Sequence, residues 1–214
     1  MKNKQPSKQI LPIVIIALVS ITAGLWLSQS TSSGKRLPQD LEATFLPEGK
    51  PLKAFSLIDH NEQTFDLDRF KGKWSFLFFG YTNCPDVCPL GMKVMQGVWQ
   101  QLPKALLDQS QMIFVSVDSD RDTPKDLKSY AQYFHPDFIG ITGKSEQIDI
   151  LTREIGILYG FEDPEAGSKD YVVNHSAQFI LIDPDARLRA VFSPPHEAAK
   201  VASTFQKITA FLGS

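Results

Sequence analysis

The chain has 214 residues, of which 43% are hydrophobic and 21% are charged. This length and composition are typical of one globular domain with an appendage, and they exclude a disordered chain. Residues 45–214 hold 17 of the 22 basic and 22 of the 24 acidic side chains, which gives that part a net charge of −5. A mildly acidic domain has no electrostatic footprint for phosphates, so nucleic acid is not an expected partner.

The N-terminal region contains an uninterrupted apolar segment. Residues 10–27 carry no charge, and Lys2, Lys4 and Lys8 precede them. At about 1.5 Å per helical residue the segment would reach about 27 Å, close to the thickness of a bilayer core. The positive-inside rule then places residues 1–9 in the cytoplasm and the rest of the chain in the periplasm or outside. We expect an uncleaved, single-pass anchor in the inner membrane. A cleaved signal peptide is the alternative, although the apolar run is long for one.

The segment after the apolar run is polar at first. Residues 28–44 are expected to form a flexible tether, and residues 45–214 the folded domain. The domain should open with a short hairpin over residues 55–59 and 64–67. A strand buried on both faces is expected over residues 74–81, because its side chains (WSFLFFGY) are almost all apolar.

Helical and strand-like segments alternate through the rest of the domain. Helices are expected over residues 89–102, 124–134, 145–157 and 197–212, the third capped by Ser145. Strands are expected over residues 112–117, 138–142, 177–182 and 188–192, the last two as a hairpin, with a polar loop over residues 161–170. This order indicates an α/β fold with helices on both faces of the sheet.

The two cysteines lie between the strand over residues 74–81 and the following helix. Such a junction collects ligands in α/β folds, and the helix dipole is expected to make Cys84 and Cys88 more acidic than ordinary cysteine. The C-x3-C spacing lets two sulfurs face one ligand, and a soft thiolate pair suits Cu(I), with zinc second. The pair could also close to a disulfide. Two inert, buried cysteines are the structural alternative.

One of the four histidines is a candidate ligand. His175 stands just before the strand expected over residues 177–182. In a thioredoxin-like sheet the loop that enters this strand faces the cysteine loop, so its imidazole would complete a set of two sulfurs and one nitrogen. A single histidine is more often structural, and that alternative stays open. His60, His135 and His196 lie in a turn or at helix ends and have no metal-type spacing.

An acidic segment (DSDRDTP) occupies residues 118–124. Its carboxylates are spaced like those of a calcium loop, but Thr123 stands where such a loop needs Gly and Ser129 where it needs Glu. One interpretation is a solvated loop with a helix cap. The other is that Asp118, at the end of its strand, points to the cysteines and there orients the histidine or tunes the thiolates.

Three motifs occur in the order found in a known family. Residues 81–89 (YTNCPDVCP), 115–124 (VSVDSDRDTP) and 171–184 (YVVNHSAQFILIDP) resemble the SCO/SenC proteins. The resemblance covers about residues 45–212, together with the anchor. It implies a thioredoxin-like α/β fold with a central mixed sheet flanked by helices. It also implies a copper-binding accessory protein for the CuA centre of cytochrome c oxidase.

The same resemblance implies site residues and partners. Cys84, Cys88 and His175 would be ligands for Cu(I) or Cu(II), and Asp118 matches a functionally implicated acid. The implied partner is the CuA domain of cytochrome c oxidase subunit II, with another periplasmic copper chaperone or a thioredoxin-like reductase as a further candidate. A metallochaperone is the leading hypothesis. A thiol–disulfide oxidoreductase that reduces the CuA cysteines through Cys84 and Cys88 is the alternative, and a copper or redox sensor is third.

The chain departs from the family pattern at two positions. Asn174 stands where the family usually has Asp before the histidine, which is expected to alter the surroundings of His175. Ala186 stands where Gly is common in the hairpin turn, and it is expected to change only the strain of that turn.

Overall fold

The computed structural model describes residues 10–31, 41, 43–162 and 171–213. Contacts divide the chain into two compact units, Met1–Leu37 and Pro38–Ser214. The predicted cytoplasmic segment, residues 1–9, lies outside the described residues. So do residues 32–40 and 42 of the predicted tether and residues 163–170 of the predicted polar loop.

The first unit contains one helix, α1 (Ile10–Thr31), of 22 residues. It includes the apolar segment and extends four residues into the segment predicted as a tether, because each residue added to an existing helix gains one hydrogen bond. Large apolar side chains on it are exposed, among them Ile16 at 66% and Trp26 at 71%. In the described part of the chain, no helix has the length and hydropathy of a membrane span.

The second unit is built on a mixed sheet of eight strands in the order β1-β10-β9-β4-β5-β6-β2-β3. Its centre is the parallel trio β4 (Trp74–Gly80), β5 (Ser110–Ser116) and β6 (Ile139–Thr142). The antiparallel strands around this trio are β1 (Thr44–Pro51), β2 (Leu57–Asp59), β3 (Thr64–Phe65), β9 (Phe179–Ile182) and β10 (Arg187–Phe192). The predicted mixed α/β sheet is therefore present.

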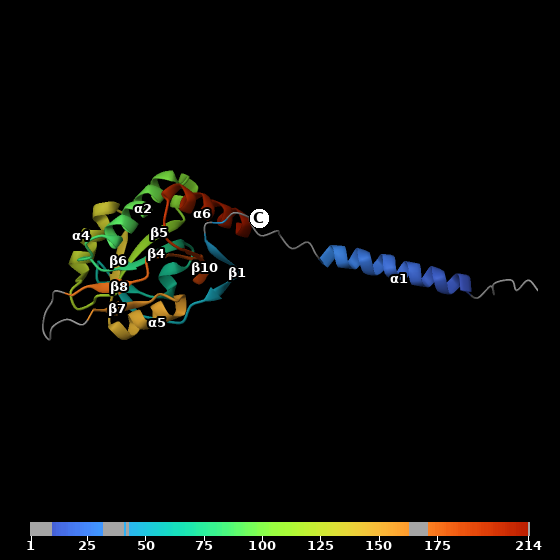
Figure 1. The fold of residues 1–214 in the computed structure, drawn as a ribbon, viewed down its shortest axis with the longest axis horizontal. Coiled ribbons are helices and arrows are strands. Elements are labelled where there is room, and N and C mark those ends of the chain that lie inside the picture. Colours follow the sequence, from blue (N-terminus) through green and yellow to red (C-terminus); the bar gives the residue numbers. More distant parts are fainter. Residues whose placement is uncertain (1–9, 32–40, 42, 163–170, 214) are drawn as a thin grey trace, which may run out of the picture. The chain divides into compact units, whose positions relative to one another are not determined.

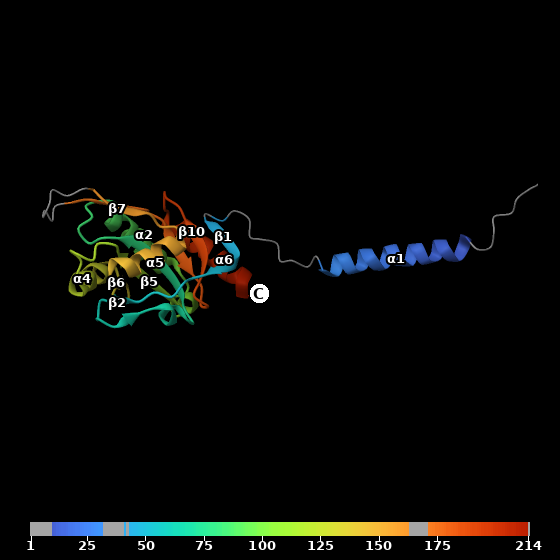
Figure 2. The ribbon, with the colours of Figure 1, turned by 90° about the horizontal axis from the view of Figure 1, so that it is seen from below.

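Helices cover both faces of this sheet. They are α2 (Val87–Gln101), α3 (Lys104–Leu107), α4 (Pro124–Phe134), α5 (Ser145–Ile155) and α6 (Ala198–Gly213), with a 3-10 turn η1 (Leu67–Phe70). In Figure 1, α2, α4 and α6 lie on one side of the sheet and α5 lies on the other. The view turned by 90° shows α5 crossing in front of the central strands (Figure 2).

The buried strand β4 explains why the sequence has an unbroken apolar run there. Every residue of β4 is buried, since β5 and β9 pair with its two edges and helices cover its faces. The ring of Phe76 packs at 5.1–6.1 Å against three aromatic rings, those of Trp99, Phe192 and Phe205. This packing fixes the first half of β4, the strand that leads into the cysteine loop.

Two strand pairs were not predicted. β1 pairs with the edge of β10 and contains Pro47 and Gly49, with a register shift between Phe45 and Lys50. Pro and Gly normally indicate a loop, but an edge strand with a bulge tolerates both. The second pair, β7 (Tyr159–Phe161) and β8 (Val173–His175), forms a separate two-stranded sheet. Strands of three residues are too short to show an alternating pattern.

The predicted cap of α5 is wrong by one residue. Lys144 occupies the N-cap position and Ser145 is the first helical residue, with no side-chain cap. The helix starts earlier because the Lys144 carbonyl already accepts the amides of Gln147 and Ile148.

Candidate metal centre

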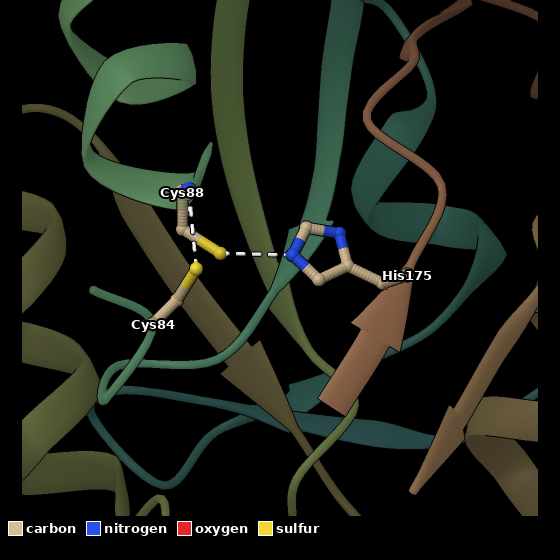
Figure 3. Close-up of side chains that lie close together, drawn as sticks. All are labelled: Cys84, Cys88 and His175. Carbon is tan, nitrogen blue, oxygen red and sulfur yellow. Dashed lines mark hydrogen bonds between the residues drawn. The ribbon is translucent and has the colours of Figure 1, made fainter. Parts of the chain in front are cut away.

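The three predicted ligands come together at one end of the central sheet. Cys84 lies in the loop after β4, Cys88 lies in the first turn of α2, and His175 is the last residue of β8 (Figure 3). One sulfur or nitrogen atom from each residue lies within 4.8 Å of the other two. Among the residues that the structure describes, this is the one group of three such side chains able to share an ion.

The start of α2 positions the two sulfurs. The helix begins at Val87, two residues earlier than predicted, and Asp86 at the N-cap makes no side-chain capping bond. The amide of Cys88 donates instead to the Cys84 sulfur, at 3.4 Å. One of the free amides of the helix N-terminus is therefore satisfied by a ligand atom, which holds Cys84 against the helix.

Burial distinguishes the two cysteines. Cys88 is fully buried and Cys84 is partly exposed. A Cβ atom on Gly80, the last residue of β4, would lie 2.6 Å from the Cys88 sulfur. Only glycine therefore leaves room for this sulfur, and an incoming ligand would meet Cys84 first.

A neighbouring carbonyl decides which of Cys88 and His175 donates the hydrogen bond between them. His175 Nδ1 lies 3.2 Å from the carbonyl oxygen of Ser176, which can only accept, so Nδ1 carries the ring proton. Nε2 then presents its lone pair to the Cys88 sulfur at 3.1 Å. The thiol donates this hydrogen bond, and a bound metal ion would replace its proton.

Burial also decides the charge of this pair. It raises the pKa of the Cys88 thiol well above the ordinary value, helped by the hydrogen bond with Cys84. It lowers the pKa of His175, against a smaller opposing effect of the Ser176 carbonyl. The prediction of a more acidic thiol is thus wrong for Cys88, because desolvation outweighs the helix dipole.

Aromatic rings and a shallow recess surround the imidazole. The rings of Tyr81 and Phe78 meet the His175 ring edge-on, at centroid distances of 6.1 and 6.3 Å. A recess of about 290 Å³ opens beside it, lined by Leu158, Tyr159, Gly160, Asn174, His175 and Ser176. The imidazole therefore lies between two aromatic rings and a recess on the side of β7 and β8.

Asp118 does not contact the three ligands directly. It is only 1% exposed, so the solvated-loop interpretation is wrong for this residue. Its Oδ2 accepts from Arg121 Nε at 2.5 Å, and its Oδ1 accepts from the Tyr171 hydroxyl at 2.7 Å. Its carboxylate bonds these two neighbours, so Asp118 can affect the ligands only through them.

The acid that holds the cysteine loop is Asp122, which the sequence did not single out. Its carboxylate accepts from the Thr82 amide at 2.9 Å, the Thr82 hydroxyl at 2.5 Å and the Ser116 hydroxyl at 2.6 Å. Burial raises the pKa of Asp122. The only signal in the sequence was its place in the acidic segment, where the neighbouring Thr123 forms the cap of α4.

The other histidines have separate roles. His60 is buried and accepts the Gly140 amide at Nδ1, at 3.0 Å. His196 stacks on Phe179 and bonds the Ala177 carbonyl. Within the described residues, His60, His196 and His135 all lie outside the group of three candidate ligands.

The two departures from the family pattern lie outside this contact set. The Asn174 side chain points away to Glu162, at 3.1 Å. Ala186 adopts a left-handed φ of 59° in the β9–β10 turn. The turn strain expected there is present, since a Cβ is disfavoured at that φ.

The fold and the site together define a thioredoxin-like protein in which two cysteines share their site with a histidine. The SCO1/SenC family model matches residues 47–210. The chain belongs to the SCO1/SenC family.

Relatives and solved structures agree with this assignment. The SCO2-like protein of Rickettsia felis is 32% identical over 184 residues, which cover 86% of this chain and 89% of that protein. The structure of Bradyrhizobium japonicum ScoI with copper bound is 30% identical with a TM-score of 0.65, over 74% of this chain and 99% of that one. Arabidopsis thaliana ScoI with copper bound is 28% identical with a TM-score of 0.68, over 74% and 97%.

Proposed function

We propose that this protein is a copper metallochaperone that delivers copper to the CuA centre of cytochrome c oxidase during assembly. The observation that carries the proposal is the group of two sulfurs and one imidazole nitrogen within 4.8 Å. Thiolate sulfur selects Cu(I), and imidazole also suits Cu(II), so one ligand set serves both states. The likeness to two copper-bound ScoI structures supports copper as the cargo.

The geometry suits delivery better than storage. Three ligands leave a coordination position open on the side of Cys84, which is partly exposed. A cysteine of the receiving subunit could bind there and lose its proton, while a departing sulfur of this protein takes one up. Copper keeps its oxidation state in such a ligand exchange, so no electron donor is needed.

Replacing His175 tests the proposal. His175→Ala leaves both thiols in place, so disulfide formation should survive while copper affinity falls. Cells that carry this variant should lose the CuA signal of their oxidase, while His196→Ala, which alters a half-buried histidine outside the group, should keep it. Normal CuA content with His175→Ala, at unchanged protein abundance, would contradict metal delivery through this site.

A thiol–disulfide oxidoreductase is the second candidate, because both cysteines are free and the Cys84 sulfur touches the Cys88 amide. The Cys84 thiolate would attack a disulfide of the oxidase subunit and form a mixed disulfide. Cys88 would then release the reduced target, and two electrons would pass from this dithiol to the target. Cys88→Ser should trap the mixed disulfide. Metal-free turnover without copper retention after desalting would favour this function.

We infer further that residues 10–27 anchor the chain in the inner membrane, with residues 45–214 in the periplasm or outside. The uncharged run, the lysines before it and the exposed apolar side chains of α1 support this. The protein should resist alkaline extraction from membranes, and protease added to spheroplasts should digest the domain. Recovery in the soluble fraction would contradict the anchor.

A further inference from the structure

Arg121 lies buried beside the candidate metal centre, with its side chain only 8% exposed. Its guanidinium carbon is 3.6 Å from the ring centroid of Tyr171 and 5.3 Å from that of Tyr81. Its Nε pairs with Asp118, and its Nη1 donates to the Tyr171 carbonyl at 2.9 Å. A planar guanidinium can stack on rings while donating in its own plane, which an ammonium cannot do.

These contacts join three segments of the site. Tyr171 is held by its ring, its carbonyl and its hydroxyl, and it leads into β8, which ends at His175. Tyr81 begins the cysteine loop and meets the His175 ring edge-on, at a centroid distance of 6.1 Å. Arg121 therefore links the acidic segment to the cysteine loop and to the strand that carries the histidine.

The histidine needs such a link because β8 is not part of the large sheet. Within the described residues it pairs with β7 alone, and each of these strands has three residues. A two-stranded sheet is marginally stable by itself. The cysteines, by contrast, are held by α2 and by the bonds between Asp122 and Thr82.

We propose that Arg121 is a positioning residue that clamps β8 to the cysteine loop and so holds His175 within reach of the two sulfurs. The expected effect on copper binding rests on the proposed copper-binding function. Removing the clamp should free the histidine and leave a two-sulfur site. Asp118 acts through Arg121, which accounts for a buried acid that does not touch the ligands.

The test uses the full-length protein with Arg121→Met, and Arg69→Met as a matched control. Arg69 also pairs with an aspartate (Asp59, 3.1 Å), donates to a carbonyl (Thr64, 3.2 Å) and lies 5.1 Å from an aromatic centroid (Phe65). These partners belong to β2 and β3, at the far edge of the sheet from β4. A general effect of losing an arginine that pairs with an aspartate and lies over an aromatic ring would therefore occur in both variants.

Copper binding gives the first readout. Arg121→Met should raise the Kd for Cu(II) by about 10–100-fold, as loss of a supporting residue around a metal typically does. Arg69→Met should raise this Kd by less than about threefold. The effect should vanish when His175 is already Ala, because the clamp acts through that residue. An equal loss in the His175→Ala background would overturn the proposal.

The metal-free protein gives the second readout. A nuclear Overhauser contact between the Tyr81 and His175 rings should be present in the wild type and Arg69→Met, and lost in Arg121→Met. If Arg121→Met does not fold, Arg121→Lys replaces it as the test variant. Lysine keeps the charge but not the planar fork, so it should still weaken the ring contact. A ring contact of wild-type strength in a folded Arg121 variant would overturn the clamp. A wild type that binds no copper would contradict the proposed function, while the ring contact would still test the clamp.

Discussion

Cys88 and His175 share one hydrogen bond, and burial shifts the pKa of each towards its neutral form. The free amides at the start of α2 do not reverse this, because the Cys88 amide points to the sulfur of Cys84. An ion that binds must displace the proton of Cys88, so copper affinity should fall as the pH is lowered. The partly exposed Cys84 and the buried Cys88 are therefore not equivalent ligands.

Tyr130 offers a stability test at a single atom. Its ring packs against Phe114 and Phe134 at 4.8 and 5.5 Å, and its hydroxyl is buried without a hydrogen-bond partner in the described part of the chain. An unsatisfied buried hydroxyl costs free energy, so Tyr130→Phe should raise the free energy of unfolding of the metal-free protein by about 1 kcal/mol. Urea unfolding measures this change.

The matched control for that change is Tyr159, whose hydroxyl donates to Asp149 at 2.6 Å. Tyr159→Phe should lower the free energy of unfolding by about 1 kcal/mol, because it removes a hydrogen bond to a carboxylate. A loss of stability with both variants would show that the Tyr130 hydroxyl has a partner in solution.

At the scale of elements, the contact of α2 with β4 depends on Gly91. A Cβ there would lie 2.6 Å from Phe78 Cε1 and closer still to Cζ. The ring of Phe78 is fully buried and packs against Phe179, so it has no free space to move into. Gly91→Ala should lower the free energy of unfolding by about 1–3 kcal/mol through overpacking, although alanine favours a helix by about 1 kcal/mol.

Gly97 in the same helix is the control for Gly91. A Cβ there would meet one atom, the Ala198 Cβ at 3.0 Å. Gly97→Ala should therefore cost less than Gly91→Ala when both are measured by urea unfolding. Equal costs would mean that overpacking against Phe78 is not the cause.

The β2–β3 hairpin should make stability depend on pH through His60. Burial lowers the pKa of His60, and its neutral Nδ1 accepts the Gly140 amide of β6. Below about pH 6.5, His60 becomes protonated in the unfolded chain but stays neutral in the folded protein. The free energy of unfolding therefore falls as the pH decreases from there towards the lowered pKa of the folded state. His60→Asn keeps an acceptor near Nδ1 and cannot titrate, so its unfolding free energy should fall less over this range. An unchanged slope would contradict this role.

At the scale of the whole molecule, the folded unit should not need copper. Its core draws buried apolar side chains from β4, β5, β9 and α6, and of the three candidate ligands only Cys88 belongs to it. A fragment of residues 38–214 should therefore show a mixed α/β circular dichroism spectrum and cooperative unfolding in the presence of a chelator. A random-coil spectrum that becomes ordered only with copper would contradict this.

The sequence by itself determined the elements with strong local signals. The apolar run of β4, the spacing of α2 and the proline at the start of α4 predicted these elements to within two residues. The residues around Cys84, Cys88 and His175 also led to the right family, because the motifs that carry the ligands are contiguous in the chain.

Only the tertiary structure decided the contacts that make the site work. The Arg121–Tyr171 bond joins residues 50 positions apart, and Asp122 bonds Thr82 across 40. The edge strand β1 and the small β7–β8 sheet likewise depend on distant partners. Burial, not the local sequence, also decided that the pKa of Cys88 is raised. A local pattern reports the periodicity of burial along one element, whereas the partner of a side chain and its desolvation depend on segments that meet only when the chain has folded.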